Sequence, residues 1–114
     1  MLGKINQLTG TPVTNPLAQD ALMKVLVGPI EGWGDHVMRV FELQPGGFTP
    51  KHAHDWPHIN FVLEGQGTLF LNGIENQVEA GAYAYIPNNE LHQFKNAGKS
   101  TFKFICIVPK DGHK

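Results

Sequence analysis

Four of the six histidines of this 114-residue chain stand where strand geometry can bring them together. His52 and His54 are two residues apart, a spacing that places both side chains on one face of an extended chain, about 6 to 7 Å apart along it. His58 follows a short turn-like segment in which Pro57 redirects the chain. His92 follows a second turn and joins the group if its strand pairs beside the first.

Four converging imidazoles predict a metal site. Imidazole nitrogen is a good ligand for several transition metals, and four neutral donors leave the full 2+ charge of the ion on the site. We therefore predict that His52, His54, His58 and His92 bind one divalent transition metal per chain, namely manganese, iron, nickel, copper or zinc. The remaining two histidines, at positions 36 and 113, are interpreted as surface or hydrogen-bonded residues.

Short strands must position these ligands. From Ala21 onward, apolar or alternating runs are separated by Gly, Pro and Asn, which is typical of an all-β sandwich or barrel, and no helix is predicted. Asn72-Gly73 favours a type I′ hairpin, and Gln44-Pro45-Gly46-Gly47 is interpreted as a turn. Residues 28–34, GPIEGWG, are interpreted as a connector, the alternative being a loop over a cavity mouth. The eight predicted strands are 21–27, 36–43, 59–64, 68–71, 74–79, 82–86, 91–96 and 101–108.

Composition excludes several classes of function. The hydrophobic content of 41% and charged content of 17% suit one compact domain. A net charge of -1 without a basic face argues against a nucleic-acid partner, and no apolar run reaches the roughly 20 residues needed to cross a membrane. A single cysteine, Cys106, and an N-terminus without an apolar signal core predict a cytoplasmic protein.

The two ends of the chain suggest how the domain is organised. Residues 1–20 lack periodicity and are predicted to form an N-terminal arm, while residues 21–114 form the single barrel domain. The last long strand, 101–108, is apolar on both faces, so one face fills the barrel. The other face, with Ile105 and Ile107, packs on a second layer or on a neighbouring subunit. This predicts a homodimer, with the arm docked across it.

The residues around the first three histidines resemble the first motif of the cupin family, which is G, five residues, H-x-H, three or four residues, E, six residues, G. Here Gly46 is followed by five residues, His52 and His54, three residues, His58, six residues and Gly65. The chain departs from the motif at one position, because His58 stands where the family usually has glutamate.

The residues around the fourth histidine resemble the second cupin motif, which is G, five residues, P-x-G, two residues, H, three residues, N. It is matched by Gly81, Pro87, Asn89, His92 and Asn96. Asn89 replaces the usual glycine, and asparagine tolerates the left-handed conformation that such a turn requires. Fifteen residues separate the two motifs, as in small bacterial cupins.

The resemblance implies a double-stranded β-helix, which is a jelly-roll-like barrel, with the metal at its open end and commonly a homodimeric assembly. The pattern looks like the four-histidine subset of the cupin 2 conserved-barrel proteins. It does not imply one reaction. A neutral histidine in place of glutamate leaves no carboxylate ligand that also serves as a base.

We expect a small-molecule ligand or substrate inside the barrel. The function first predicted is a metal-dependent dioxygenase-like enzyme acting on a small apolar, aromatic or unsaturated substrate. Open alternatives are a non-catalytic metal- or ligand-binding module and a metal-dependent isomerase or lyase. The pocket is predicted to be lined by Phe48, Trp56, Phe94, Phe104 and Cys106.

Overall fold

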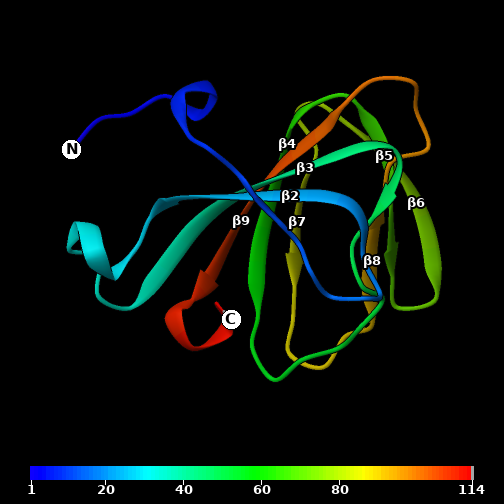
Figure 1. Cartoon of the computed structure of the whole chain (residues 1–114). Helices are drawn as coiled ribbons and strands as arrows, with labels where there is room; N and C mark the ends of the chain where they lie inside the picture. Colours follow the sequence, from blue (N-terminus) through cyan, green and yellow to red (C-terminus); the bar gives the residue numbers. More distant parts are fainter. Residues whose placement is uncertain (114) are drawn as a thin grey trace.

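The computed structural model describes residues 1–113 and is almost entirely β. Its strands form one curled sheet around an apolar interior, and the N-terminal segment crosses over the strands before it joins β2 (Figure 1). Three 3-10 helices, η1 (Ile5–Gln7), η2 (Pro29–Glu31) and η3 (Lys110–Gly112), lie between or beyond the strands. The strands are β1 (Thr11–Pro12), β2 (Gln19–Val27), β3 (His36–Phe48), β4 (His58–Glu64), β5 (Gln66–Leu71), β6 (Ile74–Glu79), β7 (Tyr83–Ile86), β8 (His92–Lys95) and β9 (Phe102–Pro109).

All strand pairs are antiparallel, in the order β6-β5-β8-β3-β9-β4-β7, with β2 on β3 and β1 on β2. The all-β, jelly-roll-like barrel predicted from the sequence is confirmed. Seven of the eight predicted strands have bounds within two residues of the observed ones. The predicted hairpin is also confirmed, because Asn72 and Gly73 both have positive φ, at +50° and +87°, between β5 and β6.

The turn predicted over residues 44–47 is wrong. β3 continues through these residues to Phe48, and Gly46, with φ at +83°, bends the strand without ending it. Before the bend, β3 pairs with β9 up to Leu43; after it, Phe48 pairs with Lys95 of β8. The glycines therefore let one strand change partners, which places β8 next to the segment that follows β3.

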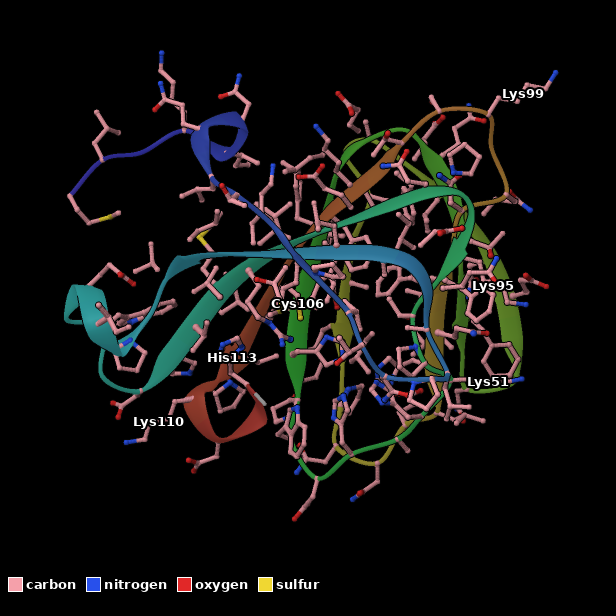
Figure 2. The ribbon with its side chains drawn as sticks, in the orientation of Figure 1. Lys51, Lys95, Lys99, Cys106, Lys110 and His113 are labelled. Carbon is pink, nitrogen blue, oxygen red and sulfur yellow. The ribbon has the colours of Figure 1, made fainter. Side chains whose placement is uncertain are left out.

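The interior is filled from the inward face of each strand. In β9 the buried side chains alternate with half-buried ones, so Phe102, Phe104, Cys106 and Val108 point inward. Cys106 lies inside the barrel, whereas the labelled lysines lie at its periphery (Figure 2). One core cluster surrounds the phenylalanines, and a second contains Cys106.

The predicted arm, residues 1–20, folds onto its own chain. Thr11 and Pro12 pair with β2. The Lys24 ammonium donates a hydrogen bond to the Ile5 carbonyl at 3.3 Å and forms an ion pair with Glu42 at 2.8 Å, with both charged side chains largely buried.

Residues 28–34 form an exposed connector that is separate from the interior cavity. No helix within residues 1–113 is long and apolar enough to span a membrane.

Candidate metal centre

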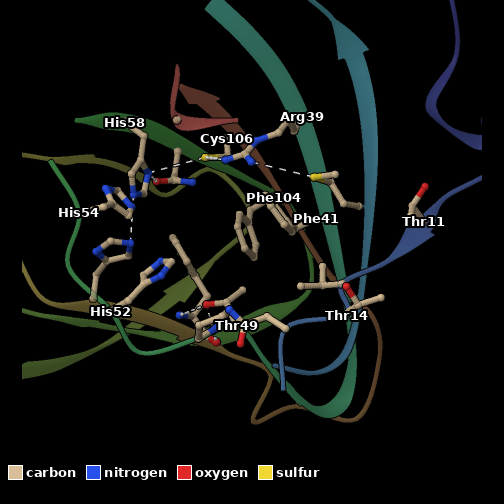
Figure 3. A pocket seen from close by; sticks show the side chains of 18 of the residues that line it. Thr11, Thr14, Arg39, Phe41, Thr49, His52, His54, His58, Phe104 and Cys106 are labelled. Carbon is tan, nitrogen blue, oxygen red and sulfur yellow. Dashed lines mark hydrogen bonds between the residues drawn. The ribbon is translucent and has the colours of Figure 1, made fainter. Parts of the chain in front are cut away.

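The inward faces of the sheet enclose one large cavity, with a volume of about 820 Å³ (Figure 3). The histidines lie at one side of it and aromatic side chains at another. No aspartate or glutamate is among the described residues that line it. The lining residues are Thr11, Pro12, Val13, Thr14, Asn15, Pro16, Met23, Arg39, Phe41, Thr49, Pro50, His52, His54, Trp56, His58, Asn60, His92, Phe94, Phe104, Cys106 and Gly112.

Three separate stretches of chain bring the four histidines together. His52 and His54 lie in the extended segment between β3 and β4, while His58 and His92 are the first residues of β4 and β8. His52 forms an isolated antiparallel bridge with His92, with backbone hydrogen bonds of 3.0 and 3.1 Å in the two directions. This bridge holds the H-x-H segment against the start of β8.

The ring nitrogens of three histidines form a compact group that could hold a metal ion, and His58 lies beside this group. One nitrogen each from His52, His54 and His92 lies within 4.8 Å of the other two. His58 joins this cluster through its Nε2 atom, which is 3.1 Å from Nε2 of His92. The His58 ring centroid lies 4.8 Å from that of His92 and 5.2 Å from that of His54.

Three of the rings are held in the protonation form that a metal ligand needs. Nδ1 of His54 lies 3.0 Å from the Trp56 carbonyl oxygen, and Nδ1 of His92 lies 2.8 Å from the Glu90 carbonyl oxygen. A carbonyl oxygen only accepts, so each Nδ1 carries the proton and each Nε2 presents a lone pair to the cluster.

The third ring, His58, is fixed by a side-chain amide. Its Nδ1 lies 2.6 Å from Oδ1 of Asn60, and Nδ2 of Asn60 donates to the Ile105 carbonyl oxygen at 3.2 Å. Because that carbonyl can only accept, the amide oxygen is the group that faces His58, which therefore donates from Nδ1. Nε2 of His58 is left free for a metal.

The histidines of the cluster are neutral near pH 7. Burial, together with the nearby His92 and His54, lowers the pKa of His52 to about 4. Burial, with a contribution from His92, lowers the pKa of His58 to about 3. Burial also lowers the pKa of His54 and of His92. Unprotonated rings at neutral pH are the form that binds a cation.

This arrangement fits a transition metal. Two nitrogen ligands that bind one ion at right angles, each at a distance of about 2.1 Å from the ion, lie about 3.0 Å from each other. The observed distance between the Nε2 atoms of His58 and His92 is 3.1 Å, which is close to this value. Both atoms present lone pairs, which repel each other at that distance. A cation between them replaces this repulsion with coordination.

The predicted pocket residues divide into two groups. Trp56, Phe94, Phe104 and Cys106 all line the cavity. Phe48 is outside the lining residues, because the bend at Gly46 and Gly47 places it where β3 pairs with Gln19 and Lys95. Trp56 stacks on His54, with ring centroids 4.4 Å apart and an interplanar angle of 7°.

Sequence reasoning missed several groups that face the cavity. Asn60 was not predicted, and neither was the wall made by residues 11–16 of the arm. Arg39 was also missed, although it shares strand parity with the inward-facing residues Val37 and Leu43. A charged residue at an inward position of an apolar strand was the available signal. No comparable signal exists for the wall, which depends on long-range contacts.

A curled antiparallel barrel with histidines converging inside its cavity defines a class of protein, the small β-barrel proteins that are able to hold a metal ion. Residues 39–108 match the family described as Cupin domain, and the chain belongs to this family. The match covers all the histidines of the cluster and Arg39.

Known relatives carry varied activities. The chain is similar to the polyketide cyclase RemF from Streptomyces resistomycificus, with 30% identity and a TM-score of 0.86 over 96% of this chain and 80% of that one. It is 33% identical to Auxin-binding protein 1 of Arabidopsis thaliana over 58% of this chain, and 29% identical to the dimethylsulfoniopropionate lyase DddW of Ruegeria pomeroyi over 69%. The matches span only 38% and 53% of those two curated relatives.

Proposed function

We propose that this protein is a metal-dependent enzyme that acts on a small apolar, aromatic or unsaturated molecule in the barrel cavity. The observation that carries the proposal is the cluster of four neutral histidines, with the Nε2 atoms of His54, His58 and His92 left unprotonated, beside a cavity whose lining includes four aromatic side chains, Phe41, Trp56, Phe94 and Phe104. His52, His54, His58 and His92 would hold one divalent transition metal. Such an ion, bound by neutral donors alone, supplies Lewis acidity or a redox centre.

The protein's own residues would bind and orient the substrate. Phe94 and Phe104 stack with ring centroids 4.1 Å apart, and Phe41 stacks on Phe104 at 5.5 Å. This row of rings offers a flat apolar surface that excludes water and positions an aromatic or conjugated molecule. No lining carboxylate is available as a general base, which favours chemistry that depends on polarising an oxygen of the substrate.

The similarity to a polyketide cyclase favours Lewis-acid ring closure or condensation as the first candidate reaction. The second candidate is the dioxygenase predicted from the sequence. If the four histidines hold the ion, it would supply either Lewis acidity for the first candidate or a redox centre for the second. The similarity to an auxin-binding protein supports a binding module as the alternative to catalysis.

One screen separates these functions. Zinc-, iron- and manganese-loaded protein would be incubated with β-diketones, catechols and flavonols, while oxygen uptake and product mass are recorded. Product that has lost water without oxygen uptake supports condensation, and product that has gained oxygen with matching uptake supports an oxygenase. Molecules that bind and are recovered chemically unchanged support a binding module and contradict the proposal that the protein is an enzyme. His92→Ala is the control, and its metal content should fall with its activity.

We also propose that the protein is a homodimer. The outward face of β9, β4 and β7 carries a patch of apolar side chains, which we call the outer apolar face, and the Lys103–Glu64 ion pair lies beyond this patch on β9 and β4. The pairs Ile59–Tyr85 and Phe61–Tyr83 place four exposed side chains together on it, beside Ile107 and Ile105. None of these six positions carries a charge, so a twofold-related copy of the same surface meets no like-charge repulsion.

A further inference from the structure

Arg39 points its guanidinium into the cavity, and no carboxylate of residues 1–113 forms an ion pair with it. Its Nη2 donates to the Cys106 sulfur at 3.2 Å, and its Nη1 lies 4.0 Å from the Met23 sulfur (Figure 3). Both sulfurs are weak acceptors. The Nε atom of Arg39 is buried and has no hydrogen-bond partner among residues 1–113.

The surroundings offer this cation no compensation. In the described part of the chain the ion pairs are Lys24–Glu42 and Lys103–Glu64, and neither includes Arg39. The ring of Phe41 lies beneath the guanidinium, 5.0 Å from its central carbon, and provides a cation–π contact only. Arg39 is half-buried, and its donors face weak acceptors and an aromatic ring, so the guanidinium lacks the anionic partner that a buried cation normally has.

The same guanidinium lies close to the histidine cluster. The Cys106 sulfur is 3.2 Å from Nη2 of Arg39 and 3.7 Å from Nδ1 of His58. The positive charge of Arg39 contributes to lowering the pKa of His54 and of His58, although burial has the larger effect. The Cys106 thiol thus lies between the guanidinium and the ring of His58, so a small molecule bound at Arg39 would lie near the histidine cluster, with its apolar part on the phenylalanine row.

We propose that Arg39 is a specificity-determining residue that binds the carboxylate of the ligand, so that the cavity selects small aromatic or unsaturated carboxylic acids over their neutral analogues. This inference deepens the proposed function, on which it rests. The fork of Nη1 and Nη2 matches the two oxygens of a carboxylate, and their present sulfur partners are weak enough to be displaced.

The test compares cinnamate with its neutral amide, cinnamamide, in chelator-treated and in zinc-loaded protein. Calorimetry gives the affinity, and quenching of Trp56, which lines the cavity, gives the location. Cinnamate should bind at least about tenfold more tightly than cinnamamide, which is the difference expected for hydrogen bonds to a charged group. Arg39→Met should abolish this preference in both metal states, Arg39→Lys should retain part of it, and exposed Lys95→Met should retain all of it.

Three results would overturn the inference. One is an equal affinity of wild-type protein for acid and amide. Another is an acid preference that survives in zinc-loaded Arg39→Met, because the carboxylate would then bind the metal. The third is an equal loss of acid and amide binding in Arg39→Met, which indicates a structural role. Zinc titrations of the wild-type protein and of Arg39→Met are carried out in parallel. They show whether the metal site itself binds zinc, so a failure of the proposed metal site is distinguished from a failure of the proposed role of Arg39.

Discussion

At the scale of single residues, each fixed ligand ring is oriented by its own neighbourhood in the chain. The acceptors for Nδ1 of His54, His58 and His92 belong to residues Trp56, Asn60 and Glu90, each two positions away. Two of these acceptors are backbone oxygens and one is a side-chain amide. Only the amide can be removed by a substitution, so His58 is the ring of the cluster whose orientation depends on a particular residue type.

We predict that Asn60→Leu weakens zinc binding by about 10- to 100-fold, because His58 loses the acceptor that fixes its tautomer. The substitution keeps the side-chain size, and chelator competition measures the affinity. Asn76→Leu is the matched control, since exposed Asn76 also donates to backbone carbonyls, at Leu69 and Ile74, but lies away from the cavity. Equal zinc affinities of the two variants would count against the role of His58.

The lowered pKa values of the histidines predict acid sensitivity of the metal-free protein. The pKa of His58 is about 3 in the fold, and that of an unfolded histidine is about 6.5. The unfolded chain therefore binds more protons below pH 6.5, and stability is lost progressively as the pH falls from 6.5 toward 3. Urea midpoints of chelator-treated protein at pH 7.5, 5.5 and 4.5 measure this loss.

The comparison that isolates this effect is the variant His58→Gln, which lacks the titrating ring. Its urea midpoint should fall less steeply between pH 7.5 and 4.5 than that of the wild-type protein. Parallel slopes for the two proteins would show that the acid sensitivity does not come from His58.

At the scale of elements, the periodic strands were predictable and the contacts between distant segments were not. The apolar run from Phe102 to Val108 indicated a strand covered on both faces, and the spacing of His52 and His54 indicated their common face. The continuation of β3 through Gly46 was missed because a glycine-rich turn and a glycine bend have the same sequence signature. His58 was placed by the turn at Pro57 and by the family motif together, although the strand was expected to begin one residue later, at Ile59.

A second contact between distant elements joins the C-terminal helix η3 to the site. A methyl group added to Gly112 would lie about 2.5 Å from the indole nitrogen of Trp56. Trp56 in turn stacks on His54. The small residue in η3 therefore leaves the space that the indole ring occupies beside a metal ligand.

We predict that Gly112→Ala destabilises the protein by about 1 to 3 kcal/mol, which is typical of overpacking, and shifts the emission of Trp56. Urea unfolding and tryptophan fluorescence measure the two effects. Gly34→Ala is the control, because no atom outside its neighbours lies within 4 Å of its added methyl group. Identical unfolding free energies for both variants would refute the contact.

At the scale of the whole molecule, the curled sheet leaves one large apolar surface uncovered. Tyr83 is 84% exposed and Tyr85 62% exposed on β7, which ends the strand order. The paired residues Ile59 and Phe61 on β4 continue this outer apolar face. An exposed apolar surface at a strand edge favours non-specific association between chains. A defined dimer that covers this surface would limit such association.

We predict that light scattering at micromolar concentration gives twice the 12.6 kDa mass of one chain. Phe61→Lys should give the single-chain mass, because a lysine at a twofold interface meets its own copy or is buried unpaired. Ile30→Lys, on the exposed connector, changes an equally apolar residue outside the face and should remain dimeric. A wild-type mass of 12.6 kDa would exclude the dimer.

The N-terminal wall of the cavity has a consequence for how such proteins diversify. Residues 11–16 shape the space available to a ligand, yet they contribute none of the histidines. They attach to β2 through the paired residues Thr11 and Pro12 and through Val13, whose backbone N–H donates to the Ala21 carbonyl oxygen. Substitutions at the lining positions 14–16 would therefore reshape the cavity while leaving in place the strands that carry the histidines. The size of the cavity can in this way vary separately from the histidine cluster within one short chain.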